Sequence, residues 1–271
     1  MPTNRPLPSP RRLPLRHLLP VAVLAVLLTI AHPASSAPAD DGWGVVDGAA
    51  HPQSGQLIRF DAAGNALGGC SGTLLSPTVF LTAGHCAIRK QQNPGMDLWV
   101  TFDTTWTKAD PPTARYRVAY AVASPTLDLG VEVLETAVTA VDPAELPTEG
   151  ALDRLLAATT DHPELAVVGY GQGGNVNDRG DDPQPWTESV RRRATVEALR
   201  VDSTDVRTSG LGDHPSTGCA GNSGGGMFRP GTDDLVALMW ASNPMCSGYL
   251  LGTRLDTVAA RDFLAGFVAV P

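Results

Sequence analysis

Charged and aromatic residues are scarce in this chain. Only 18% of its 271 residues are Asp, Glu, Lys or Arg and 6% are aromatic, whereas 42% are hydrophobic. Basic residues are the scarcest charged class: the formal net charge is −8, and beyond residue 39, where 16 basic residues face 28 acidic ones, it is −12. Phosphate backbones and anionic lipid surfaces repel such a chain. We therefore expect no nucleic-acid or membrane-surface function. The length and the apolar content are sufficient for one large domain or two small ones.

The N-terminal region has no hydrophobic run long enough to span a membrane. The uncharged run at residues 18–31 has fourteen residues and contains Pro20, whereas a spanning helix needs roughly 20. Arginines precede this run and small residues follow it at 32–39, which is the pattern of a secretory signal. We expect residues 1–39 to be this signal, with cleavage after Ser36 or Ala39 and release of a secreted protein with no membrane attachment.

Cysteine is also rare, and no CxxC pair is present. An even number of cysteines in an exported chain favours disulfides over a zinc site, although a site built from all four stays possible. Four cysteines allow three pairings. The two local pairings would join Cys70 to Cys86 and Cys219 to Cys246, one in each half of the chain.

Short apolar segments separated by turns predict an all-β protein. We expect strand-rich halves over residues 40–141 and 165–255, joined by a Pro-, Glu- and Asp-rich linker at 142–164. A helix should close the chain at 256–271, with Asp256 as its N-cap. Two strand-rich halves suggest two packed β-barrels, but composition alone leaves a single sandwich open. The strand candidates are residues 57–60, 70–75, 78–82, 98–102, 115–122, 129–134, 165–170, 189–201, 225–228, 235–240 and 250–254.

Five glycines surround Ser223 within residues 218–226. Glycine permits positive φ and close approach of another backbone, so this run can present the serine hydroxyl and nearby N–H groups to a ligand. A flexible loop is the simpler interpretation. The Gly-x-Ser-x-Gly spacing also fits the α/β-hydrolase elbow, but that family places its histidine after the serine. The last histidine here, His214, precedes Ser223, which excludes that fold.

A serine nucleophile needs a neighbouring imidazole held in one tautomer. His85 follows an apolar strand and adjoins Cys86, whose disulfide would hold it rigidly. The other histidines beyond the signal, His51, His162 and His214, each precede a proline in polar sequence, and we expect them to be solvated.

The imidazole needs a carboxylate partner, and Asp128 between two leucines is the best candidate. Burying a carboxylate without a partner costs several kcal/mol, so an acid in apolar sequence indicates a partner. Asp103 and Asp110 are weaker candidates because both lie in polar, turn-like sequence.

The order His85, Asp128, Ser223 and the motifs Cys-Ser-Gly-Thr-Leu-Leu-Ser-Pro and Thr-Ala-Gly-His-Cys resemble the trypsin-like (chymotrypsin-fold) serine endopeptidases, bacterial secreted type. Subtilisins have the order Asp, His, Ser, which Asp47 or Asp61 could supply, but their serine motif is missing. The resemblance runs from about Val45 to the C-terminal helix. It implies two packed six-stranded antiparallel β-barrels with a C-terminal helix, and a secreted, monomeric enzyme that cleaves protein or peptide substrates through an acyl-enzyme without metal or cofactor.

The resemblance also implies residue roles. His85 would act as general base and acid, Asp128 would orient it, and Ser223 would attack the carbonyl. The N–H groups of Gly221 and Ser223 would form the oxyanion hole. The strand around Trp240 and Ala241 would pair with the substrate backbone. Thr217 would form the floor of the specificity pocket, with Ala241 and Leu250 as its walls. A disulfide between Cys219 and Cys246 would brace this pocket.

Two positions depart from the family pattern. Asn222 stands where many relatives have an aspartate that pairs with a new N-terminal ammonium, so we expect folding alone to assemble the oxyanion hole. Thr217 offers no carboxylate to a basic side chain of the substrate, so we expect a preference for small or medium apolar residues before the cleaved bond.

Three other functions were considered from the sequence. A catalytically silent relative could use the same cleft as a protein-binding module. The acids at residues 178–182 could hold Ca²⁺, but without ordered ligand spacing we expect a solvated loop. Arg191, Arg192 and Arg193 form too short a basic run for nucleic-acid binding.

Overall fold

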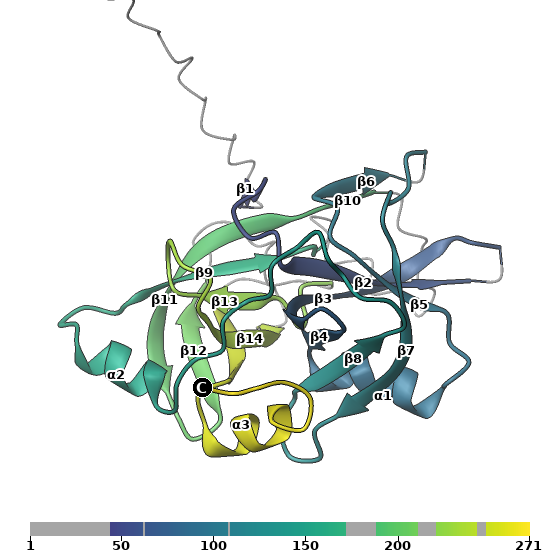
Figure 1. Ribbon diagram of the computed structural model, residues 1–271. Helices are drawn as coiled ribbons and strands as arrows, with labels where there is room; N and C mark the ends of the chain where they lie inside the picture. Colours follow the sequence, from purple (N-terminus) through teal and green to yellow (C-terminus); the bar gives the residue numbers. More distant parts are fainter. Residues whose placement is uncertain (1–43, 62, 108, 172–187, 211–220, 243–247) are drawn as a thin grey trace, which may run out of the picture. The chain divides into compact units, whose positions relative to one another are not determined.

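The computed structural model describes residues 44–61, 63–107, 109–171, 188–210, 221–242 and 248–271. Its first half is a closed barrel in which each strand pairs antiparallel with its neighbours, in the order β2-β3-β4-β8-β7-β5 (Figure 1). The strands are β2 (Ser54–Phe60), β3 (Ala66–Ser76), β4 (Val79–Thr82), β5 (Leu98–Thr101), β7 (Tyr116–Ala123) and β8 (Gly130–Leu134).

The second half forms another closed antiparallel barrel, because β9 pairs with both β11 and β13. The expected fold of two six-stranded barrels is therefore confirmed. Short strands lie outside this closure: β1 (Val45–Val46) pairs with β11, and β6 (Thr105–Thr107) pairs with β10 (Glu188–Val190). The barrel strands are β9 (Glu164–Gly169), β11 (Arg192–Val201), β12 (Asp205–Ser209), β13 (Gly226–Phe228), β14 (Leu235–Ser242) and β15 (Tyr249–Arg254).

The structure contains the helices α1 (Gly84–Gln92), α2 (Ala151–Ala157) and α3 (Val258–Leu264). The segment expected as a linker contains α2. The prediction of Asp256 as the cap of α3 was wrong: Thr257 caps the helix by accepting a hydrogen bond from the Ala260 N–H at 3.3 Å. Asp256 instead accepts from the Leu152 N–H in α2 at 2.8 Å and from Arg254, because a buried carboxylate gains more from these partners.

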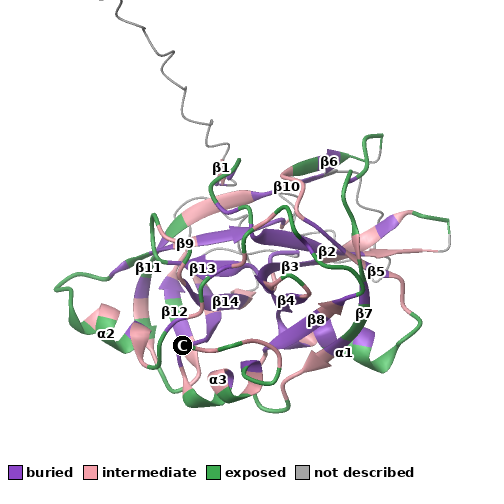
Figure 2. Ribbon diagram, in the orientation of Figure 1, coloured by how far each residue is buried: buried purple, intermediate pink, exposed green. Residues whose placement is uncertain are grey.

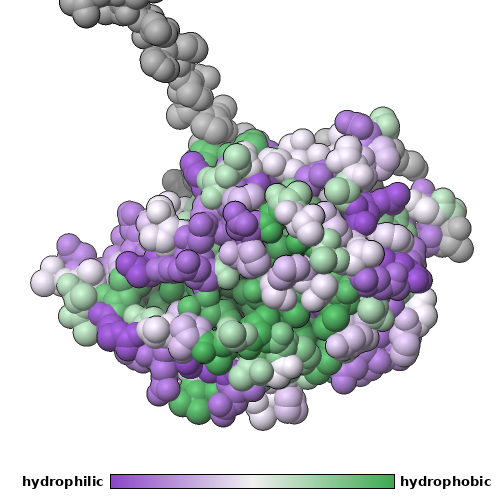
Figure 3. All heavy atoms as spheres, viewed as in Figure 1, coloured by the Kyte–Doolittle hydropathy of each residue, from purple (hydrophilic) through white to green (hydrophobic). Residues whose placement is uncertain are grey.

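Apolar side chains fill both barrels and the space between them, and Figure 2 shows buried residues along the strands of both barrels. One cluster joins first-barrel residues such as Leu74 and Phe80 to second-barrel residues such as Phe228 and Leu235. Each fully buried side chain of this size stabilises the fold by about 1.5–3 kcal/mol. On the face drawn in Figure 3, hydrophobic residues gather around α3 and the C-terminal segment, where Val270 packs against the same cluster.

A buried ionic network fixes the start of the described chain. Asp47 binds His51 Nδ1 at 2.7 Å and Arg191 Nε at 3.0 Å, and Arg191 also donates to the carbonyls of Gly48 and Ser54. The expectation of a solvated His51 was wrong, since the residue is 6% exposed; the carboxylate of Asp47 replaces the water that the ring loses. Burial acts to raise the pKa of Asp47, but the hydrogen bond from His51 and the charges of His51 and Arg191 outweigh it, so the pKa is lowered.

We expect Arg191→Met to lower the free energy of unfolding by about 3–5 kcal/mol, because it leaves the Asp47 carboxylate buried beside one partner fewer. Arg229→Met is the control: it removes an exposed arginine paired with Asp234 and should cost about 0–1 kcal/mol. Urea denaturation at pH 7 measures both. The lowered pKa means that ionised Asp47 stabilises the fold above its unfolded pKa and that this stabilisation is lost as the pH falls through the folded value. Equal losses in the two variants would contradict this assignment.

Candidate functional site

His85 lies in the first turn of α1, directly after β4. The residue before the helix, Ala83, has no side chain able to cap it. The carboxylate of Asp128 takes that role from a distant loop: Oδ1 accepts from the His85 backbone N–H at 2.8 Å, and Oδ2 lies 2.8 Å from His85 Nδ1. A helix N-terminus favours an anion at this position. One carboxylate therefore holds both the backbone and the ring of His85, which leaves the other ring nitrogen, Nε2, for a further partner.

The environment of Asp128 keeps its carboxylate ionised. Burial acts to raise its pKa, but hydrogen bonds from the His85 ring and backbone and the charge of His85 outweigh it, so the pKa is lowered. The side chains of His85 and Asp128 are 41% and 25% exposed, so the pair lies at a surface that a large ligand can reach.

Both barrels hold Asp128 in place. Within the first barrel, the Ser124 N–H donates to the Leu129 carbonyl at 2.7 Å and closes the loop that carries Asp128, while Leu129 is fully buried. From β15 of the second barrel, the Thr253 hydroxyl donates to the Asp128 carbonyl at 3.1 Å. The position of this carboxylate therefore depends on contact between the barrels.

The loop that carries Ser223 has a backbone that only glycine adopts readily. Gly221 and Gly224 have φ values of 95° and 87°, and the Gly225 N–H donates to the Asn222 carbonyl at 2.8 Å. A β-carbon on Gly224 would lie 2.2 Å from the Ser71 carbonyl and 2.9 Å from the Ala83 nitrogen. The glycines therefore permit a tight turn that lies directly against the first barrel.

Ser71 on β3 binds this turn at two points. Its backbone N–H donates to the Ser223 carbonyl at 2.9 Å, and its hydroxyl donates to the Gly221 carbonyl at 2.8 Å. The same hydroxyl accepts from the Tyr170 N–H at 2.8 Å, and Thr82 Oγ1 donates to the Ser71 carbonyl. Ser71 belongs to one of the recognised sequence motifs, but no role was predicted for it. A serine in a strand gives no sign in the sequence of a hydrogen-bond partner 150 residues away.

The structure brings the Ser223 turn beside the segment that leads to His85. Gly224 packs against Ala83 and Thr82 of the first barrel, two and three residues before His85. Among the described contacts, no hydrogen bond joins the Ser223 hydroxyl to the His85 ring. Such hydrogen bonds are often long in unliganded enzymes and tighten when substrate binds.

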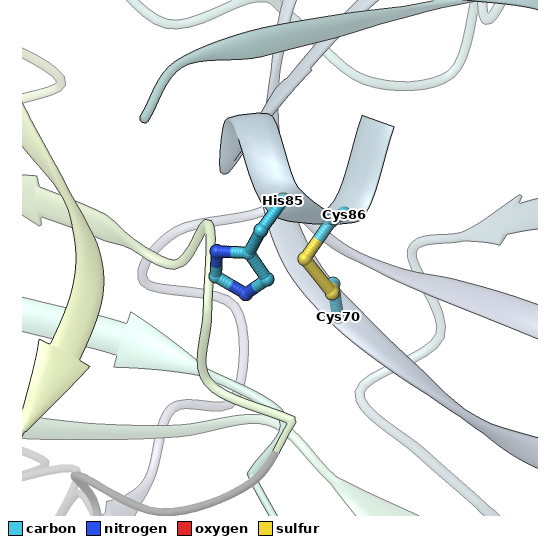
Figure 4. A group of neighbouring side chains, drawn as sticks. All are labelled: Cys70, His85 and Cys86. Carbon is cyan, nitrogen blue, oxygen red and sulfur yellow. A yellow bond between two sulfur atoms is a disulfide. The ribbon is translucent and has the colours of Figure 1, made fainter. Parts of the chain in front are cut away.

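The predicted disulfide between Cys70 and Cys86 is present, which removes the zinc site that needed all four cysteines. Figure 4 shows the disulfide beside the His85 ring at the start of α1. One potential metal-ligand atom from each of these three residues lies within 4.8 Å of the other two, but sulfurs bonded to each other cannot serve as thiolate ligands. This group is therefore a rigid support for His85 rather than a metal site.

The remaining predicted residues divide between described and undescribed parts of the chain. Trp240 Nε1 donates to Asp205 Oδ1 at 2.9 Å, and Ala241 follows it on β14. Leu250 is 1% exposed and packs in the core of the second barrel, which leaves little of its side chain for a ligand. Thr217, Cys219, Cys246, His214 and the acids at 178–182 lie outside the described residues.

The other histidines and acids considered from the sequence are either exposed or bound to other partners. Asp103 accepts hydrogen bonds from Thr113, and Asp110 and His162 are exposed. Asp47, considered for the subtilisin order, binds His51. In the described part of the chain, Asp128 is the carboxylate that contacts His85.

Comparison with known proteins agrees with this geometry. The model of the family described as Trypsin matches residues 47–257. A solved structure titled "HL collagenase structure at 1.7 Å resolution" is similar to this chain with a TM-score of 0.57 at 14% identity, over 84% of this chain and 99% of the other. At that identity the likeness shows the fold alone. No curated protein matches.

We expect Gly224→Ala to destabilise the protein by about 2–4 kcal/mol, because the new β-carbon overlaps Ser71 and strains a positive φ. Gly231→Ala is a matched control: its φ is 73°, but nothing lies within 4 Å of the added carbon. That variant should therefore lose only about 1 kcal/mol, the cost of the φ strain. Urea denaturation measures the difference, and similar losses would show that the turn does not need its close contact with the first barrel.

Proposed function

The chain belongs to the trypsin family of serine proteases, and from this premise we propose that it is a secreted endopeptidase that cleaves protein or peptide substrates through His85, Asp128 and Ser223. The observation that carries the proposal is the double hydrogen bond from His85 to Asp128 beside the glycine-rich Ser223 turn. The Ser223 hydroxyl attacks the substrate carbonyl as His85 Nε2 accepts its proton. Ionised Asp128 stabilises the resulting imidazolium, which then protonates the leaving amine. Water hydrolyses the acyl-enzyme by the same steps.

The N–H groups of Gly221 and Ser223 are suited to stabilise the oxyanion. In the described residues, neither donates a hydrogen bond to a protein acceptor, although Gly221 is buried. A buried N–H group is seldom left without an acceptor, so the Gly221 N–H, close to the N–H of the half-buried Ser223, supports a site for an anionic oxygen. Losing one such donor costs about 3 kcal/mol of transition-state stabilisation.

We further propose that formation of this site does not require a new N-terminal ammonium. Asn222 is 4% exposed, and its Oδ1 accepts from the Gly171 N–H at 2.7 Å. The oxygen of the neutral amide is thus bound by backbone. Val45 and Val46 pair with β11. This pairing supports the view that the sheet holds this segment, rather than an ion pair between an N-terminal ammonium and a group near Ser223.

Secretion is part of the proposal. The signal pattern at residues 1–39 and the Cys70–Cys86 disulfide both support an oxidising compartment. Among the residues that the structure describes, no helix has the length and apolar character needed to cross a membrane. The absence of cofactors and the monomeric state stay predictions.

The competing function is a silent relative that binds protein through the same cleft. It retains the three side chains, so only misplacement of the serine hydroxyl would make it inactive. Labelling by a fluorophosphonate separates the two functions, because the reagent reacts with a serine that is activated by its base.

We expect a fluorophosphonate to label Ser223 in the intact protein and to leave Ser223→Ala unlabelled, with a loss of about 10⁶-fold in kcat. Asp128→Asn should lose about 10⁴-fold because the imidazole takes the wrong tautomer. Ser203→Ala, at an exposed turn serine, is the control and should keep full activity. A folded protein that the reagent does not label would support the binding module instead.

We expect protein that retains residues before Asp40 to match the kcat/KM of protein trimmed to begin at Val45, within about twofold. The physical reason is that Asn222 cannot form an ion pair with a new ammonium group. Active-site titration of both forms normalises the rates. Activity that depends completely on trimming would refute this part of the proposal.

A further inference from the structure

A small pocket opens on the first barrel beside the disulfide. It lies where α1 meets β2, β3 and β5 and has a volume of about 60 Å³, enough for the end of one side chain. Its walls include the disulfide pair Cys70 and Cys86 and the apolar side chains of Leu57 and Leu98. Neither the His85–Asp128 pair nor the Ser223 turn lines it.

The pocket is close to the proposed reaction centre through two short covalent connections. Cys86 follows His85 directly, and Cys70 precedes Ser71, whose N–H binds the Ser223 carbonyl. The sulfurs of this disulfide lie within 4.8 Å of a ring nitrogen of His85, so the disulfide wall of the pocket adjoins the proposed reaction centre.

The position of the pocket indicates which part of the substrate enters it. The strand expected to pair with substrate contains Trp240 and Ala241, the second of which is an expected wall of the pocket for the residue before the cleaved bond, and this strand is β14 of the second barrel. The pocket is built from the first barrel alone, and Figure 4 draws the disulfide on the opposite side of His85 from the yellow-green strand of the second barrel. The pocket is therefore suited to the leaving-group side, the residues that follow the cleaved bond.

Two arginines give the pocket a charge opposite to that of the whole chain. Arg59 on β2 and Arg89 on α1 both line it, and its described lining contains no carboxylate. Neither guanidinium forms an ion pair with a described acid, whereas Arg117, Arg191, Arg229 and Arg254 all do. In a chain with net charge −8, these two cations give the lining of the pocket a positive charge with no carboxylate beside it.

From these observations we propose that the pocket binds an acidic side chain of the substrate, within the first three residues after the cleaved bond, through Arg59 and Arg89. The proposal rests on the endopeptidase function proposed above and adds a substrate preference to it. A guanidinium presents several N–H donors in a plane that matches the two oxygens of a carboxylate. The apolar walls contact the methylene groups of the same side chain.

The net negative charge of the protein opposes this binding only weakly. Exposed charges farther apart than about 8–10 Å are largely screened at physiological salt, whereas both arginines belong to the lining of the pocket that the carboxylate would enter. Partly exposed pairs of this kind contribute modestly. We therefore expect a preference of about fivefold to tenfold rather than an absolute requirement.

The test uses fluorogenic peptides that are identical except for Glu, Gln or Lys at one of the first three positions after the cleaved bond. At the responsive position, kcat/KM for Glu should exceed that for Gln by about fivefold to tenfold, with Lys below Gln. The Glu/Gln ratio should fall toward 1 in 0.5 M NaCl and in Arg59→Gln/Arg89→Gln. The double variant Arg117→Gln/Arg229→Gln removes two positive charges from exposed ion pairs outside the pocket and should keep the wild-type ratio.

The result that overturns the proposal is a Glu/Gln ratio near 1 at all three positions, or the same ratio in wild type and in Arg59→Gln/Arg89→Gln. Failure of the proposed function is recognised separately, by a protein that cleaves none of the peptides and resists fluorophosphonate. In that case the corresponding leaving-group peptides, with free amino ends, are titrated into the protein and followed by calorimetry. Tighter binding of the Glu peptide that disappears in the pocket variant supports the charge preference, and equal binding of the Glu and Gln peptides overturns it.

Discussion

The contact between Ser71 and the Ser223 turn is the constraint on which the rest of the site depends. His85 and Asp128 belong to the first barrel and Ser223 to the second, so neither barrel contains the whole site. Ser71 joins them with a backbone donor to the Ser223 carbonyl and a hydroxyl donor to the Gly221 carbonyl. Because Gly224 has no side chain, the two backbones can approach this closely. Packing of the barrels and assembly of the site are therefore the same physical event.

The Asp128 carboxylate combines a structural role with the chemical role that we propose for it. Capping the first turn of α1 fixes the backbone of His85, and the second oxygen fixes its ring. A cap supplied by residue 83 itself would stabilise the helix equally well but would leave the ring free to rotate. The Thr253 hydroxyl adds a constraint from the second barrel. In the proposed mechanism, the His85 tautomer that base catalysis requires is thus fixed by the same carboxylate that caps the start of α1.

Much of the fold was predictable because its strands are apolar, alternate regularly and lie between turn residues. The His85 and Ser223 motifs were recognisable because glycine and cysteine have few other uses in such positions. The strand β12 (Asp205–Ser209) was missed, since its five residues include two charged and two uncharged polar side chains. His51 was misjudged from its polar neighbours, although Asp47 four residues earlier is its partner. Contacts that join distant segments, such as those of Ser71 and Thr253, leave no local pattern in a single sequence.

The start of the domain and the Ser223 turn are stabilised in different ways, and the difference bears on how activity arises. Near residue 47 the chain is stabilised by a buried ion pair between Asp47 and Arg191, either of which would be costly to bury alone. Beside Ser223 it uses a neutral amide, with Asn222 bound to the Gly171 N–H. A neutral group makes no demand for a counter-charge from elsewhere in the chain. This agrees with our proposal that the turn reaches its final conformation when the barrels pack, without a charge supplied by cleavage of the chain.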